Sequence, residues 1–280
     1  MSCLTITVID VGWGDSILIE AEEKGQSFFG LIDSNDTTYE LSSYLFLKRF
    51  FERGGIDTKG APVFEFVLLT HGHADHASGL PLIIRKFGAK RFLYSRGSVH
   101  PILAQILRYQ TRPGSRLRHT QAIDDATDLS KLRFGTVSLD VLWPPQDLSD
   151  DDQNNHSVVL AATLGNVTFI LSGDATAEVW PQIVQRLPKT LRVFQVPHHG
   201  AHNGTFAGNN TTPWLDHIVQ IKPAVEAVIS SHTRPFNHPN PTVVKALAGT
   251  TPPVQTFRTD LHYHVTVSTN GANTSVSYSH

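Results

Sequence analysis

The chain has 280 residues, of which 40% are hydrophobic and 17% are charged, and these values exclude a disordered or fibrous chain. The formal net charge of −2 at pH 7 favours no particular class of partner. A single cysteine, Cys3, excludes an internal disulfide framework and suits a reducing compartment. There is neither a signal-peptide pattern at the start nor a run of about eighteen apolar residues, so we expect a soluble, cytoplasmic protein without a membrane segment.

Short apolar runs rich in β-branched residues predict strands along the whole chain. They occupy residues 4–11, 16–21, 28–33, 64–70, 137–143, 157–164, 167–172, 191–196, 224–230 and 263–268. Helical spacing or helix-start signals predict helices at 39–53, 80–87, 99–109, 176–186, 212–222 and 241–248. Two polar stretches, 111–120 and 144–155, are expected to be exposed loops.

The order of these elements predicts a mixed fold, α/β or α+β in class. The early strands follow one another with turn signals such as Gly12 to Gly14, which favours hairpins, whereas helices separate the later strands. We therefore expect two sheets with helices outside, formed by residues 1–280 as a single domain.

Positive charge is concentrated in one stretch of the sequence. No acidic residue occurs between His76 and Ile123, whereas nine lysines and arginines do. A basic surface lowers the cost of approaching nucleic acid phosphates, and the candidate contacts are Arg112, Arg116 and Arg118. The alternative, a solvated basic helix face neutralised by the aspartates that follow, stays open.

The segment "THGHADH" directly follows the predicted strand 64–70. His71 and His73 are two residues apart, so in an extended segment both imidazoles turn to one side, while Asp75 and His76 face a second point nearby. The pattern predicts two ligands for each of two metal ions. Histidines that merely cap the next helix are the alternative, and it suits an isolated His-x-His better than this four-ligand pattern.

Other predicted strand ends supply further ligands. His156 precedes one strand of a predicted hairpin and Asp174 follows the other, which makes Asp174 a candidate for a carboxylate that bridges two ions. His198 follows the strand 191–196 and is the favoured ligand there, with His199 as an alternative ligand or a phosphate contact. The loop after strand 224–230 offers His232, Arg234, Asn237 and His238, unless these side chains are only solvated in a proline-braced loop. Fifteen histidines against one cysteine favour nitrogen and oxygen ligands.

These motifs resemble those of the metallo-β-lactamase fold hydrolases. The matching positions are the complete His-x-His-x-Asp-His signature at residues 71–76, an aspartate at the end of an early strand and the later ligands: Asp33, His156, Asp174 and His198. Within that superfamily, the chain is similar to the hydrolase domain of ComEC-type competence proteins in "DVGWGDSILIE", "NNHSVVL", "VPHHGA", "FNHP" and "RTD". It departs from those motifs at Trp13, Ala201 and Phe236-Asn237, where the family has Gln, Ser and Tyr-Gly.

The resemblance implies a four-layer αββα sandwich that holds two divalent metal ions, with zinc expected and manganese as the alternative. One ion is expected on His71, His73 and His156 and the other on Asp75, His76 and His198, with Asp174 between them.

The implied activity is that of a metal-dependent hydrolase, in which a metal-bridging hydroxide attacks a phosphodiester, and nucleic acid is a candidate substrate. Asp75 would orient the hydroxide, His232 or His238 would protonate the leaving oxygen, and His199, Arg234 and Asn237 would contact the phosphate. The first alternative is a hydrolase of a lactone, thioester or β-lactam, and the second is a non-catalytic metal-binding module.

Overall fold

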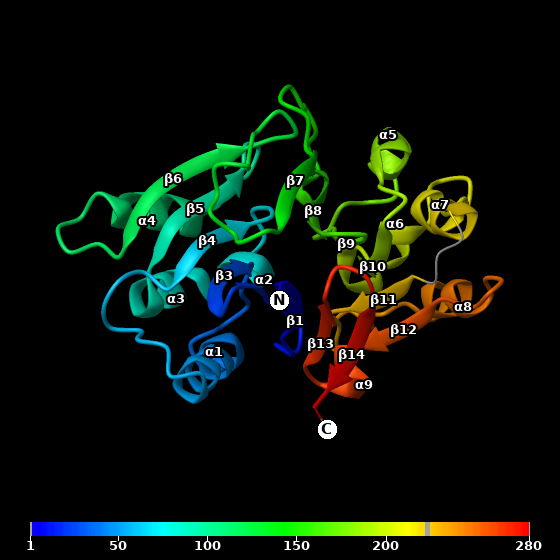
Figure 1. Cartoon of the computed structure of the whole chain (residues 1–280). Coiled ribbons are helices and arrows are strands. Elements are labelled where there is room, and N and C mark those ends of the chain that lie inside the picture. The colour runs from blue at the N-terminus through cyan, green and yellow to red at the C-terminus, as the bar shows by residue number, and fades with distance from the viewer. Residues whose placement is uncertain (1, 222–224, 280) are drawn as a thin grey trace.

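Two β-sheets lie at the centre of the computed structural model, which describes residues 2–221 and 225–279 (Figure 1). The larger sheet has eight strands in the order β14 (Thr274–Tyr278), β13 (Val265–Thr269), β1 (Ser2–Val8), β2 (Ile17–Glu23), β3 (Gln26–Ile32), β4 (Phe64–Leu69), β5 (Ala89–Ser95) and β6 (Leu117–Ile123). The smaller sheet has six, in the order β12 (Gln255–Arg258), β11 (Glu226–Ile229), β10 (Leu191–Gln195), β9 (Val167–Leu171), β8 (Val159–Leu164) and β7 (Ser138–Trp143).

Each sheet combines an antiparallel part with a parallel part. Strands β1 to β3 form hairpins, whereas β3, β4, β5 and β6 are parallel neighbours. In the second sheet β7, β8 and β9 are antiparallel, and β9, β10, β11 and β12 are parallel. Loops that leave the carboxyl ends of parallel strands gather at one edge of a sheet, which is where α/β proteins usually bind ligands.

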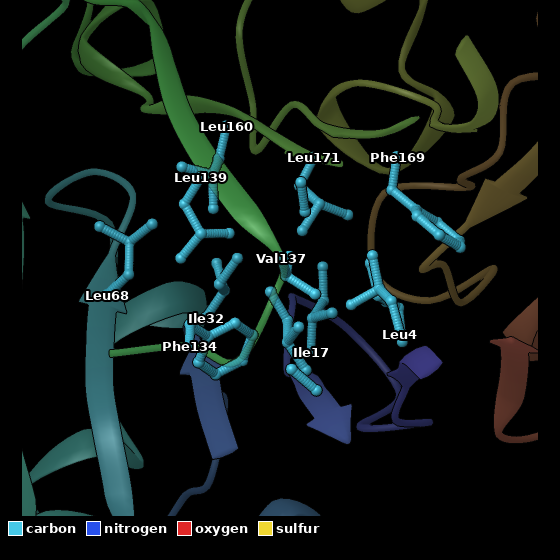
Figure 2. Close-up of a cluster of buried hydrophobic side chains, with 14 of the residues drawn as sticks. Leu4, Ile17, Ile32, Leu68, Phe134, Val137, Leu139, Leu160, Phe169 and Leu171 are labelled. Carbon is cyan, nitrogen blue, oxygen red and sulfur yellow. The ribbon is translucent and has the colours of Figure 1, made fainter. Parts of the chain in front are cut away.

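The space between the sheets holds the largest apolar cluster. Figure 2 shows Ile17, Ile32 and Leu68 of the first sheet beside Leu139 and Leu160 of the second. All of these side chains are buried, and the inner positions of the strands are apolar because each strand alternates between its two faces.

Helices cover the outer face of each sheet. On the eight-stranded sheet these are α1 (Ser42–Arg53), α3 (Leu80–Phe87) and α4 (Pro101–Gln110), and on the other sheet they are α5 (Trp180–Ile183), α7 (Pro213–Ile221) and α8 (Pro241–Ala248) (Figure 1). Short helices fill the loops: α2 (Ala74–Ala77), α6 (His202–Thr205), α9 (Thr259–His262), η1 (Gln153–His156), η2 (Val184–Arg186) and η3 (His198–Gly200). The αββα sandwich is confirmed.

Four strands have no counterpart in the prediction, namely β5, β6, β12 and β14. Their sequences lack a continuous apolar pattern, as in "LRHTQAI" of β6 and "TSVSY" of β14. These two strands form the edges of the larger sheet, where fewer side chains are buried and polar residues are tolerated. The stretch 111–120, predicted to be a loop, therefore enters β6 at Leu117. The predicted helix 176–186 is also shorter, since the chain forms α5 only at Trp180 and continues as the 3₁₀ turn η2.

The predictions for helix 212–222 and strand 224–230 include residues 222 and 224, which lie outside the described residues; the observed elements are α7 and β11. Within residues 2–221 and 225–279, no helix combines the length and the apolar character that crossing a membrane requires.

Candidate metal centre

The first candidate ligands lie where strand β4 ends. Strand β4 lies inside the sheet and is apolar except for Glu65, and the chain stays buried through Thr70 and His71 before it turns into helix α2 at Ala74. His71 and His76 are completely buried, Asp75 is buried, and His73 is partly exposed. A buried strand therefore delivers four polar side chains to one point.

Asp174 and His199 reach the same point from the second sheet. Asp174 follows β9 and Gly173, whose φ of +49° is in the left-handed region, and a Cβ at Gly173 would lie 3.2 Å from side-chain atoms of Ser157 and Thr70. His198 and His199 follow β10 with φ values of 52° and 54°, which costs a non-glycine residue on the order of 1 kcal/mol each. This backbone directs the two adjacent imidazoles toward the carboxylate of Asp174.

The Asp174 carboxylate lies between two groups of ligand atoms. In the first group, His71 Nε2 is 3.8 Å from Asp174 Oδ2 and 3.0 Å from His73 Nδ1. In the second, His76 Nε2 is 3.3 Å from Asp174 Oδ2, and His199 Nε2 is 3.4 Å from Asp174 Oδ1 and 3.5 Å from Asp75 Oδ2. Within each group, one ligand atom from every residue lies within 4.8 Å of the others.

Several of these buried atoms have no hydrogen-bond partner among the described residues. They are His76 Nε2, His199 Nε2 and Asp174 Oδ1, and all three point into the second group. A buried polar atom without a partner costs about 1 to 3 kcal/mol, so a cluster of them indicates a ligand. Imidazole nitrogens and carboxylate oxygens at this spacing fit a divalent metal ion.

The carboxylates of the cluster keep their negative charge. Burial acts to raise the pKa of Asp75, but His76 and His199 outweigh it and lower the pKa to about 2. At Asp174 burial also acts to raise the pKa, yet His199, His76 and His198 hold it well below its ordinary value. Both carboxylates are therefore ionised, and a bound cation would neutralise their negative charge.

The pKa values of the buried histidines shift in opposite directions. Burial, together with the neighbouring His76, lowers the pKa of His71 well below its ordinary value, so His71 is neutral and can coordinate through a free nitrogen. Burial acts in the same direction on His76 and His199, but Asp174 and its neighbouring carboxylates raise both pKa values well above the ordinary value. Without metal, these two imidazoles are protonated, and their positive charge neutralises the carboxylates.

A second layer of carboxylates orients the ligands. Asp33, at the end of β3, accepts hydrogen bonds from Thr70 and lies 2.7 Å from Nδ1 of His76. Nδ1 of His199 lies 3.0 Å from the carbonyl oxygen of Ser230, and Asp15, which accepts a hydrogen bond from the Gln195 side chain at 2.7 Å, lies 3.5 Å from the same nitrogen. Carboxylate and carbonyl partners of this kind fix the tautomer and the ring orientation of a metal-binding histidine. Neither Asp15 nor Gln195 was singled out from the sequence as a site residue.

His156 does not join the ligand groups found among the described residues. Its Nε2 lies 2.8 Å from the carbonyl oxygen of Asp150, and its ring packs against Gly97. Asn154, two residues earlier, lines the cavity beside His73 and Asp174, and its Oδ1 is buried and has no hydrogen-bond partner within residues 2–221 and 225–279. The motif "NNHSVVL" contained the signal for Asn154, since the family pattern it resembles begins with that asparagine.

The structure also separates the candidates in the two histidine-rich loops. His199 is buried among the second group of ligand atoms, whereas His198 is partly exposed with Nε2 3.7 Å from Asp174 Oδ2. His238 lines the same cavity of about 360 Å³, with its ring centroid 6.0 Å from that of His198. His232, Arg234 and Asn237 are exposed and do not line that cavity, and His232 Nδ1 accepts a hydrogen bond from the backbone of Arg234.

The three candidate arginines lie far from this centre. Leu117 at the start of β6 pairs with Ala89, which pairs with Phe64, so Arg116 and Arg118 are level with the beginning of β4, whereas the ligands follow its end. The loop between α4 and β6, which carries Arg112, forms the left edge of Figure 1, and α2 lies near the middle. The guanidinium of Arg116 donates to the carbonyl oxygens of Thr58, Gly60, Ala61 and Lys86, so it ties a loop to the sheet.

Comparison with known proteins agrees with the sequence motifs. ComE operon protein 3 of Bacillus subtilis is 23% identical over 252 residues, and Recombination protein 2 of Haemophilus influenzae is 24% identical over 244 residues. Both alignments cover 86% of this chain, which spans only 30% and 26% of the two relatives. The similarity confirms the resemblance to ComEC-type proteins.

Solved structures show the same fold at low identity. Igni18, a metallo hydrolase from the archaeon Ignicoccus hospitalis, matches with a TM-score of 0.54 and 16% identity over 94% of this chain and 98% of its own. Unliganded yeast PDE1 matches with a TM-score of 0.54 and 12% identity over 92% of this chain and 97% of its own.

A model of the metallo-beta-lactamase superfamily matches residues 64–207, just over half of the chain. These residues include the loop after β4, Asn154, Asp174 and His199. The chain therefore belongs to the metallo-beta-lactamase superfamily of metal-dependent hydrolases.

Proposed function

We propose that this chain is a phosphodiesterase that uses two divalent metal ions and acts on nucleic acid, with residues 1–280 forming one hydrolase domain. The observation that carries the proposal is the carboxylate of Asp174, which two groups of ligand atoms share at the side of an open cavity. When bound there, two divalent ions would polarise phosphoryl oxygens and activate water as a nucleophile.

The distances between the candidate ligand atoms support one ligand set for each ion. We propose His71, His73 and Asp174 for one ion, with Asn154 Oδ1 in the place that His156 was expected to fill. We propose Asp75, His76, His199 and Asp174 for the other ion, with His199 in place of His198. Zinc, with manganese as the alternative, and a cytoplasmic location remain predictions.

Two imidazoles at the cavity suit a phosphate better than a neutral acyl group. Burial, together with neighbouring histidines, lowers the pKa values of His198 and His238, so both are neutral at pH 7. A neutral imidazole can donate its N–H to a non-bridging phosphate oxygen without repelling the metal ions, and such donors stabilise the charge that builds up as phosphorus is attacked. We therefore assign His238 to phosphate binding rather than to protonation of the leaving oxygen.

The roles of the remaining residues follow from their positions. Asp75 lies between His76 and His199 and keeps its charge, so it can bind metal and orient the attacking water by accepting a hydrogen bond from it. His232 and Arg234 are exposed, so we propose that they contact only a substrate that is long enough to extend beyond the cavity. Nucleic acid is the favoured substrate because one relative carries the name Recombination protein 2, and the alignment with that relative covers 86% of this chain.

The test is metal analysis coupled to a substrate panel. Purified protein reconstituted with zinc or manganese should hydrolyse bis-p-nitrophenyl phosphate and DNA or RNA, and should leave a lactone and a cephalosporin intact. Asp75→Asn should abolish this turnover while circular dichroism stays unchanged. Hydrolysis of the lactone or the cephalosporin, with none of the phosphodiester, would refute the proposal.

A further inference from the structure

Two aromatic side chains stand at the mouth of the candidate metal centre. Trp13 and Phe236 both line the cavity that contains Asp75, Asp174 and His199. Their ring centroids are 5.2 Å apart and their planes are inclined at 57°, so neither ring covers the other as in a parallel stack. Phe236 is 57% exposed and Trp13 is partly exposed. Large aromatic side chains usually bury their area, so an exposed pair beside a polar site indicates a binding surface.

The loop that carries Trp13 is fixed to the metal centre. Gly12 and Gly14 have φ values of +70° and +101°, and a Cβ at Gly14 would overlap the carbonyl oxygen and Cβ of Asp75. The backbone N–H of Asp15 donates to that carbonyl at 3.3 Å, and Asn35 donates to the carbonyl of Trp13. These contacts join the backbone of the Trp13 loop to the helix that carries Asp75, so the fold sets where this loop lies relative to the candidate ligands.

Phe236 is joined to the other side of the site. It precedes Asn237, whose backbone N–H donates to Thr233 at 2.7 Å, and its ring lies 6.1 Å from that of His238. The loop returns to the ligands through Asn240, whose backbone N–H donates to Gly200 at 2.9 Å, next to His199. Two loops from different sheets thus bring the aromatic rings together above one cavity.

We propose that Trp13 and Phe236 form a stacking site for a nucleobase next to the scissile phosphate, so that the substrate enters as a single strand. This inference rests on the proposed phosphodiesterase function. Several candidate metal ligands, the imidazoles of His198 and His238 and the aromatic rings of Trp13 and Phe236 line one cavity, and a nucleotide matches it because it carries a phosphate and a flat ring. In a duplex the base faces are already stacked on one another, so only an unpaired base can use these rings. A lactone or a β-lactam has no comparable aromatic face.

The first test reads binding without catalysis. Trp143, Trp180 and Trp214 are all buried, which leaves Trp13 as the only partly exposed one of the four tryptophans, so quenching of intrinsic fluorescence reports on Trp13. Metal-loaded protein is titrated with thymidine 5′-monophosphate and with 2-deoxyribose 5-phosphate, which lacks the base. We expect quenching by the nucleotide alone and affinity for it ~10-fold higher than for the sugar phosphate. Equal affinities without quenching would overturn the proposal.

The second test compares two diesters that share a leaving group, thymidine 5′-p-nitrophenyl phosphate and methyl p-nitrophenyl phosphate. Trp13→Ala and Phe236→Ala should each lower kcat/KM for the thymidine diester ~5- to 100-fold and leave the methyl diester unchanged. Trp13→Phe should retain most of the activity, which guards against a folding defect in Trp13→Ala. Tyr39→Ala is the matched control, since Tyr39 is 95% exposed and does not line the cavity.

The outcomes separate this inference from the proposed function. If the wild type hydrolyses both diesters and the aromatic variants lose both equally or neither, the stacking site is refuted and the phosphodiesterase stands. If the wild type hydrolyses neither diester, the proposed function fails, and the fluorescence titration still decides whether a nucleobase binds at Trp13.

Discussion

His76 Nδ1 lies 2.7 Å from Asp33 Oδ2, and both side chains are completely buried. Since Asp33 also accepts hydrogen bonds from the backbone and the hydroxyl of Thr70, its carboxylate is fixed and the N–H of His76 must point toward it. The other nitrogen, Nε2, is then directed at Asp174 and has no partner among the described residues. This one contact determines which nitrogen of His76 is available to a metal ion.

Asp33→Asn should therefore weaken metal binding without removing a ligand. An amide at this position presents an N–H to His76 Nδ1 and forces the proton onto Nε2, where it blocks coordination. We expect metal affinity, measured by competition with a chromophoric chelator, to fall ~10- to 100-fold. Asp36→Asn is the matched control, because Asp36 is buried and accepts hydrogen bonds from Ser43 and Tyr44 at the start of α1 rather than from a ligand. Equal losses of metal affinity in Asp33→Asn and Asp36→Asn would contradict the role of Asp33 in orienting His76.

Asp174→Ala should change the number of bound metal ions. Asp174 is shared by the group of His71 and His73 and the group of Asp75, His76 and His199, so its loss should remove a ligand from each ion. We expect elemental analysis to find about two ions per wild-type chain and at most one per variant. Retention of two ions would exclude a bridging role.

Metal removal should lower thermal stability. Without metal, the buried carboxylates of Asp75 and Asp174 keep only histidines as partners, and a ligand that binds only the folded state at about 1,000 times its Kd contributes ~4 kcal/mol. We expect a chelator to lower Tm by ~5 °C or more, and zinc or manganese to restore it. If elemental analysis shows that the protein is loaded with metal, but removal of the metal leaves Tm unchanged, the metal is not bound at a buried centre.

The two adjacent histidines after β10 should differ in effect. His199→Ala removes a buried imidazole that we propose as a ligand, and it should reduce metal affinity at least ~100-fold, which is more than the loss of an outer partner causes. His198→Ala should leave affinity nearly unchanged and act on kcat/KM for a phosphodiester, because His198 is partly exposed at the cavity. The reverse result would restore His198 as the ligand.

The sequence predicts most of the larger elements and most members of the candidate metal cluster because both depend on local patterns. A buried strand ends where its apolar run ends, so the positions of His71 to His76 and of Asp174 at strand ends follow from the pattern. The choice between His198 and His199 depends on two left-handed backbone residues, and the place of His156 depends on a carbonyl contact with Asp150. Neither has a periodic signal, and the three-dimensional separation of Arg116 from the ligands depends on strand register.

The arginine-rich segment supports a last prediction, in which Arg116 differs from its neighbours. Its guanidinium donates to four carbonyl oxygens, and hydrogen bonds from a charged donor contribute ~1.5 to 3 kcal/mol each when buried and less here, where the side chain is partly exposed. Arg116→Ala should therefore lower Tm. Arg112→Gln and Arg118→Gln change exposed side chains and should leave Tm unchanged.

None of the three substitutions should change kcat/KM for a small diester, because β6 begins at the end of the sheet opposite the ligands. For the same reason, the affinity for an eight-nucleotide single strand and its dependence on salt should match the wild type in Arg112→Gln and Arg118→Gln. A steep loss of affinity in these two variants would instead show that the strand extends from the metal centre across the outer edge of the sheet, as the charge pattern of the sequence suggests.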